Sequence, residues 1–250
     1  MAGSNSDMKY CYVLNYVHLF LYILCFICSY YITYASSFCL LSSIFVGWSL
    51  YAFVTVGHDC MHKNFTPYSS FNNSFALIFL NGILMPKDLW QMEHRLHHSD
   101  PGNENDTMLL DGGTFFTELY HLVKAQKTLT IKENLQKLPL FILLLMLPLY
   151  CLPIIWISMI VSFMYLSLTP HITHPHLRQQ SQENRLNPKN VAWNIFPKSH
   201  LYTFIAGGLN IHACHHENPR WTRSQLMKEA NEEYMTINSV KAYLTLLYTR

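Results

Sequence analysis

Charged residues are scarce in this sequence, and long stretches of it have none. Only 13% of the 250 residues are charged, whereas half are apolar. Soluble domains carry about 25% charged residues, so this chain has too few to cover a water-facing surface, and we expect part of its surface to face lipid. The sequence also lacks a basic tract and any nucleic-acid-binding motif, and its net charge is only +2. We therefore expect no nucleic-acid partner.

A disulfide framework and a cleavable signal peptide are also missing. The seven cysteines are odd in number and show no framework spacing. Cys25 and Cys28 form a Cys-x-x-Cys pair inside a long apolar run, where they are interpreted as small apolar residues of a helix. That run, residues 11–31, is too long for the apolar core of a signal peptide and has no small-residue cleavage pattern. It is predicted to remain as a membrane helix.

Two stretches contain no Asp, Glu, Lys or Arg: 49 residues at 10–58 and 40 residues at 138–177. One membrane-spanning helix needs about 20 apolar residues, so each stretch is about twice that length. Backbone polar groups must be paired within the protein in lipid, which favours helices. The simplest prediction is two helical hairpins, with four spans near residues 12–32, 38–57, 138–147 and 154–169.

The predicted fold is a single all-α, polytopic membrane domain over residues 1–250. Two hairpins place both termini, the connecting loops and every charged residue on one side of the membrane, which the positive-inside rule makes cytosolic. This side would form a helical cap, and the shorter apolar stretch at 75–85 would lie at the interface. The alternative is a soluble all-α protein that buries both hairpins.

Fourteen histidines are present, and most fall in four clusters. Three clusters, at 58–62, 94–98 and 212–216, place histidines three or four residues apart, which is the spacing of one helix face. Each is therefore expected to aim its imidazoles at one point, on the cytosolic side of the membrane. A His-x-x-His-His pattern that occurs twice is a strong signal of metal binding. The predicted ligands in these clusters are His58, His62, His94, His97, His98, His212, His215 and His216.

Eight imidazoles are too many for one ion and fit two. The fourth cluster, residues 170–176, is expected to add one ligand from His171 or His174, and His171 is preferred because it directly follows the last predicted span. Asp59 and Asn210 are candidates to hold ligating histidines through their second ring nitrogen. Imidazole suits Zn, Cu, Fe and Ni. Iron is favoured because the site borders an apolar environment, where oxidation is the commonest use of a redox metal.

The three clusters resemble the histidine boxes of the membrane-bound fatty acid desaturase superfamily. Their order matches, and residues 169–176 resemble the segment that supplies a further iron-binding histidine in that superfamily. The resemblance implies a non-haem di-iron centre that uses O₂ and two electrons to remove hydrogen from an unactivated C–H bond. It also implies a ferredoxin, or cytochrome b5 with its reductase, as electron donor. The sequence contains no cytochrome b5 His-Pro-Gly-Gly segment, so the donor is expected to be a separate protein.

Within this superfamily the predicted function is fatty acyl desaturation in lipid metabolism. The alternative is a carotenoid (beta-carotene) ketolase or another lipid hydroxylase, because the motif at 58–62, Pro101-Gly102 followed by Asp106, and Pro170-His171 also resemble ketolases. A remote alternative is a metal transporter with a histidine-lined path, which would need more polar groups within the spans. A zinc hydrolase is disfavoured because no His-Glu-x-x-His string occurs.

Overall fold

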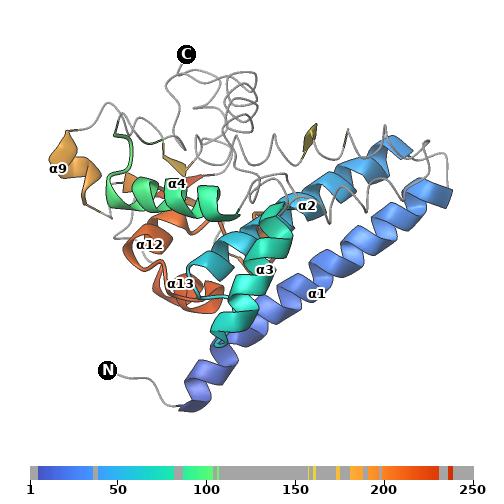
Figure 1. Cartoon of the computed structure of the whole chain (residues 1–250), viewed down its shortest axis with the longest axis horizontal. Coiled ribbons are helices and arrows are strands. Elements are labelled where there is room, and N and C mark those ends of the chain that lie inside the picture. Colours follow the sequence, from blue (N-terminus) through green and yellow to red (C-terminus); the bar gives the residue numbers. More distant parts are fainter. Residues whose placement is uncertain are drawn as a thin grey trace.

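The described part of the chain is mostly helical, with one small sheet (Figure 1). The computed structural model describes residues 5–35, 39–81, 87–103, 106, 157, 160–161, 173–174, 181–187, 191–196, 199–230 and 236–238. The first four helices are α1 (Asn5–Ala35), α2 (Cys39–Met61), α3 (Ser69–Asn81) and α4 (Lys87–Ser99). The remaining elements are α9 (Gln182–Arg185), β1 (Asn194–Phe196), α11 (His200–Ile205), α12 (His212–Glu217), α13 (Arg223–Glu229) and β2 (Thr236–Asn238).

Helices α1 and α2 form a long hairpin (Figure 1). Their segments Tyr12–Ile32 and Leu41–Met61 are long and apolar enough to cross a membrane. The first agrees with the predicted span at 12–32. The second helix runs past the predicted end at 57 to Met61, because His58, Asp59 and Cys60 are buried and continue the helix. Apart from residues 157 and 160–161, which are helical, the predicted spans at 138–147 and 154–169 lie outside the described residues.

Helix α3 packs along α2 and encloses one apolar core. This core is formed by buried side chains of the hairpin, the loop between α2 and α3, α3 and the start of α4: Tyr22, Ala52, Val54, Val56, Cys60, Phe65, Ala76, Leu80 and Trp90. A Cβ at Gly57 would lie 3.0 Å from Cγ of Leu80. A small residue at this point therefore lets α3 approach α2 closely.

A second apolar core lies in the cap, where α12 and α13 meet the segment around β1. It contains Val191, Ala192, Ile211, Ala213, Cys214, Leu226, Met227 and Ala230. Strands β1 and β2 pair in parallel, with Ile195 opposite Ile237. The prediction of a purely α-helical protein is therefore wrong in this detail. Three-residue strands carry too little periodicity to be found in sequence.

Strand β1 also supports the helix that carries the third histidine cluster. The side-chain oxygen of Asn194 accepts the backbone N–H groups of Ala213 and Cys214 at 3.0 and 3.4 Å. Ile211, which precedes α12, supplies no side-chain cap of its own. Since the first N–H groups of a helix have no partner within it, Asn194 replaces the missing cap and fixes the start of α12.

Three aromatic side chains of the hairpin connect α11 to α1 and α2. The Tyr22 hydroxyl, the Trp48 indole and the Tyr51 hydroxyl donate to the backbone oxygens at the end of α11, those of residues 204, 205 and 206, at 2.8, 2.9 and 3.1 Å. The last carbonyls of a helix lack partners within it. The hairpin satisfies them and holds the chain that leads into α12.

Candidate metal centre

The end of α2 brings the first two histidines into the cap. His58 and His62 are four residues apart, and their ring centroids lie 4.8 Å from one another. The His58 ring also lies 4.6 Å from that of His215 and 4.7 Å from that of His94. Three helices that are distant in sequence therefore meet at the last turn of α2.

Helices α4 and α12 each divide their histidines between two groups. The first group contains His58, His62, His94, His98 and His215. The second group contains His97, His174, His212 and His216. In each group one ring nitrogen of every residue lies within 4.8 Å of the others. Each cluster was expected to aim at a single point, whereas the pairs four residues apart serve one group and the residue between them serves the other.

The nitrogens that converge in the second group cannot all be satisfied by hydrogen bonds to one another. His97 Nδ1 lies 2.9 Å from the Asp106 carboxylate, and His174 Nδ1 lies 2.7 Å from the Val191 carbonyl. Both partners only accept, so both Nδ1 atoms carry a proton, and each ring in its neutral form presents a lone pair at Nε2. These two Nε2 atoms nevertheless lie 3.2 Å apart. A shared cation would remove the repulsion between them.

The spacing of the other nitrogens fits the same interpretation. His174 Nε2 also lies 2.9 Å from His212 Nε2 and 3.2 Å from His216 Nε2. In the first group His94 Nε2 lies 2.8 Å from His62 Nε2 and 3.1 Å from His98 Nε2. Ligands bonded to one ion at about 2.1 Å are separated by about 3 Å when their bonds are at right angles. The residues present therefore fit two metal ions, one in each group.

Two buried histidine nitrogens without hydrogen-bond partners also favour a bound ion in the first group. Among the described residues, the buried Nε2 atoms of His58 and His215 have no hydrogen-bond partner. Both belong to the first group. A buried polar atom without a partner costs about 1–3 kcal/mol, and an ion bound by the group would supply the missing partner.

Burial keeps six of these imidazoles in the form that binds metal. Burial, with a smaller contribution from His58, lowers the pKa of His62 to about 3. Burial also lowers the pKa of five further histidines, and neighbouring histidines lower it further: His94, His98, His212, His215 and His216. Only the neutral ring has a free lone pair for a metal, so these residues are ready to bind at neutral pH.

The structure gathers all eight histidines predicted from the three clusters. The ninth position of the two groups is filled by His174, the alternative to the preferred His171, and His171 itself lies outside the described residues. Asp59 contacts His58 Nδ1 at 3.0 Å. Asn210 donates to the Thr203 hydroxyl at 3.1 Å, and no contact with a histidine is recorded for its side chain within the described ranges.

Two residues that matter to the site were not predicted for this role. Asp106 holds His97 and also accepts the Gly102 N–H at 2.7 Å. Asp106 follows the second histidine cluster closely and comes just after Pro101-Gly102, and this sequence pattern could have identified it as a support for a histidine. Arg223 binds Asp59 at 2.7 Å. Burial disfavours its charge, but Asp59 and Tyr22 raise the pKa of Arg223 above its ordinary value. Nothing local in the sequence pairs Arg223 with a residue so far away.

Comparison with known proteins agrees with this geometry. The family described as Fatty acid desaturase matches residues 34–133, which include the first two clusters. One similar protein is the sn-1 acyl-lipid omega-3 desaturase (ferredoxin) of Synechocystis sp., 39% identical over 56 residues, or 22% of this chain and 15% of that protein. Another is the Delta(12)-oleate desaturase of Trichosanthes kirilowii, 35% identical over 60 residues, or 24% of this chain and 16% of that protein.

The matched segments are short relative to the proteins that contain them. They span about a sixth of the length of those relatives, for example 17% of the sn-1 acyl-lipid omega-3 desaturase (ferredoxin) of Nostoc sp.. The family match itself covers the end of the hairpin and the first two boxes. The gathered histidines extend the agreement to the third box, which lies beyond that match. This chain is therefore similar to the Fatty acid desaturase family over residues 34–133, and to acyl-lipid and oleate desaturases over short segments.

Proposed function

We propose that this chain is an oxygen-dependent di-iron oxidoreductase that introduces a double bond into the fatty acyl chain of a membrane lipid. One observation carries the proposal: nine histidines form two adjacent groups at the end of an apolar hairpin. The hairpin is suited to lipid, and the histidines are suited to a pair of redox metals. An acyl chain in the bilayer would reach the site without leaving its apolar surroundings.

The first group would hold one iron and the second group the other. Imidazole also suits zinc, copper and nickel, and the superfamily favours iron. The bound irons would supply the redox chemistry by which O₂ and two electrons remove two hydrogens from neighbouring carbons. The protein's own part is to orient the imidazoles and to fix which ring nitrogen carries the proton. Asp59, Asp106 and the Val191 carbonyl do this through Nδ1 of three of the rings.

The membrane arrangement in this proposal has four spans, with the cap and the histidines in the cytosol. Two helices of suitable length and composition are seen, and all charged residues fall outside the two charge-free stretches. The single domain is proposed to extend over residues 1–250. Accessibility of Cys214 to a membrane-impermeant reagent tests the orientation, since labelling from outside intact cells would contradict a cytosolic cap.

The substrate is proposed from the names of the similar proteins. Those relatives are acyl-lipid and oleate desaturases, which favours an acyl lipid over the carotenoid of the ketolase alternative. Two of them are named as ferredoxin enzymes. A ferredoxin is therefore the proposed electron donor, ahead of cytochrome b5 with its reductase, and would dock on the cytosolic side.

The proposal is tested by expressing the chain, with a ferredoxin and its reductase, in a host supplied with oleate and linoleate. Gas chromatography and mass spectrometry of the fatty acid methyl esters should reveal a new double bond. The matched control is His62→Ala, which should yield none. Oxidised carotenoids in a pigment-producing host, with no change in the fatty acids, would establish the ketolase alternative instead.

A further inference from the structure

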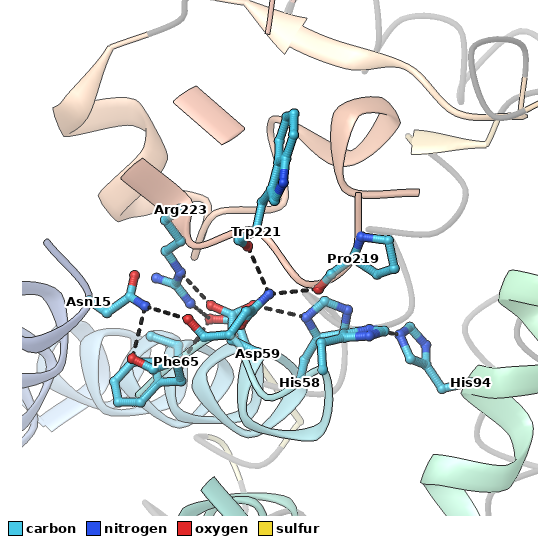
Figure 2. Close-up of polar contacts among 12 residues, drawn as sticks. Asn15, His58, Asp59, Phe65, His94, Pro219, Trp221 and Arg223 are labelled. Carbon is cyan, nitrogen blue, oxygen red and sulfur yellow. Dashed lines mark hydrogen bonds and ion pairs between the residues drawn. The ribbon is translucent and has the colours of Figure 1, made fainter. Parts of the chain in front are cut away.

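We infer that Arg223 is a positioning residue for the first histidine group: its guanidinium holds the Asp59 carboxylate, and Asp59 in turn orients His58. The inference rests on the proposed function, since it concerns the metal affinity of the proposed site. It assigns a role to a buried charge that lies in α13, outside all the histidine clusters. Figure 2 shows Arg223, Asp59 and His58 in one line of polar contacts.

Arg223 is a buried charge with several polar partners and not a surface charge. It is only 2% exposed, and a buried arginine needs partners for its donors. Its Nε donates to Asp59 Oδ2 at 2.7 Å, and its Nη2 donates to the Thr55 hydroxyl at 3.2 Å. Nη1 donates to the Tyr22 hydroxyl at 3.1 Å and lies 3.4 Å from His18 Nδ1. Each nitrogen thus has a partner on the membrane hairpin.

The two oxygens of Asp59 have separate tasks. Oδ2 receives the arginine, and Oδ1 lies 3.0 Å from His58 Nδ1. An ionised carboxylate can only accept, so the His58 proton is held at Nδ1 and the lone pair at Nε2. That Nε2 is one of the buried atoms without a hydrogen-bond partner in the described structure, and His58 belongs to the first group. Arg223 therefore affects the metal site indirectly, because it holds the Asp59 carboxylate that orients His58.

The surrounding backbone is shaped for this contact. Gly208 has φ of +88°, and a Cβ built there would lie 2.9 Å from Arg223 Nε. Thr222 begins α13 with a complete capping box, which fixes the residue just before the arginine. The Asn64 side chain donates to the backbone oxygens of Pro219 and Trp221 at 2.9 and 3.0 Å. The chain that follows α2 thus holds the chain that precedes α13.

A purely structural clasp between α13 and the hairpin is the competing explanation. It would act through Thr55, Tyr22 and His18, the other three contacts of the guanidinium. The two explanations differ in what happens to the two metal ions. Loss of a purely structural clasp would weaken metal binding in both groups alike, because α13 contacts α12 and α12 contributes histidines to both groups. A positioning role affects the first group, because the second has its own supports in Asp106 and the Val191 carbonyl.

The test is metal affinity, measured separately from turnover. Purified protein is stripped of metal and titrated with iron(II) without oxygen, in competition with a chromogenic chelator. In Arg223→Gln one of the two ions should bind about 10–100-fold more weakly, the range observed when outer partners of ligands are removed, while the other keeps wild-type affinity. Arg223→Lys restores the charge without the planar fork and should recover part of the loss.

A double-mutant cycle identifies the route. If Arg223 acts through Asp59, then Asp59→Asn with Arg223→Gln should be no weaker in iron binding than the weaker single variant. Arg220→Gln, an exposed arginine three residues earlier, is the matched control and should bind both ions normally. Tyr22→Phe removes one clasp contact of the arginine and should also leave both affinities unchanged.

Three results would overturn the inference. They are wild-type affinity for both ions in folded Arg223→Gln, equal weakening of both ions, or a Tyr22→Phe variant as weak as Arg223→Gln. Circular dichroism and thermal unfolding of the metal-free proteins establish folding. If Arg223→Gln does not fold, Arg223→Lys and Tyr22→Phe are compared instead. Only Arg223→Lys should weaken the binding of one of the two iron ions. A wild-type protein that binds two irons but forms no double bond would instead refute the proposed function.

Discussion

The two histidine groups share helices α4 and α12 but draw their remaining ligands and supports from different parts of the chain. The first group is completed by His58 and His62 at the end of α2, and its support reaches through Asp59 to Arg223 in α13. The second is completed by His174 and supported by Asp106 and a backbone carbonyl. One group is thus anchored by buried charges to the hairpin of α1 and α2, and the other to residues outside it.

Helical geometry explains why one short motif can serve both groups. Successive residues of an α-helix are about 100° apart, and residues four apart nearly coincide in direction. His94 and His98 therefore face the first group, and His97 faces the second. In α12 the assignment is reversed, because His212 and His216 face the second group and His215 the first. The doubled His-x-x-His-His pattern is a device for bridging two sites.

Removing one predicted ligand from either group should have the largest effect on activity. This change tests whether both groups are needed for desaturation. His215→Ala takes a ligand from the first group and His97→Ala one from the second. Both should lower desaturation by more than about 100-fold, since loss of an outer partner alone costs about 10–100-fold. Iron per chain and new double bonds are measured together. His200→Ala, at an exposed histidine, is the control. Full iron loading in both variants would show that the ligands are wrongly assigned.

A smaller effect should separate the two supports. Asp106→Asn retains the shape of the side chain but removes the charge that accepts from His97 and Gly102. We expect about 10–100-fold weaker binding of one iron, and the ion affected should be the one that Arg223→Gln leaves unchanged. Chelator competition on both variants and on their combination measures this. If both variants weaken the same ion, the division into separately supported groups is wrong.

The glycine beside Arg223 offers a test of the first support through stability. Gly208→Ala would place a Cβ 2.9 Å from Arg223 Nε at a positive φ of 88°. Such backbone strain costs about 1–3 kcal/mol. Thermal unfolding in detergent should show this loss, together with weaker binding of the first group's iron only. A control is Gly102→Ala, also at a positive φ, which should perturb the second group instead because the Gly102 N–H binds Asp106.

The sequence predicted the features that depend on local pattern. The charge-free stretch placed the first candidate span at 12–32, and the segment Tyr12–Ile32 of α1 is long and apolar enough to cross a membrane. The i, i+3, i+4 spacing identified eight of the histidines that the structure brings together. The end of α2 was predicted four residues too early, because polar residues such as Asp59 suggest a loop when their buried partners are not visible.

Long-range pairing could not be predicted in the same way. The contact between Asp59 and Arg223 joins residues 164 positions apart, and an isolated Arg has no pattern that announces a buried partner. The pairing of β1 with β2 is another contact of this kind. The preference for His171 over His174 stays a prediction because His171 lies outside the described residues, and the contact of His174 Nδ1 with the Val191 carbonyl is another long-range pairing that no sequence pattern indicates.

The smallest predicted effect concerns the helix start that presents Arg223. Thr222 accepts the Gln225 backbone N–H, and the Gln225 side chain accepts the Thr222 backbone N–H. Thr222→Ala removes the first of these contacts and should cost about 1 kcal/mol of stability, measured by thermal unfolding, whereas Thr222→Ser should retain most of it. Because Arg223 is also held by its own buried contacts, iron binding in the first group should weaken less than in Gly208→Ala. Weakening as large as that of Arg223→Gln would mean that the cap, more than the ion pair with Asp59, places the guanidinium.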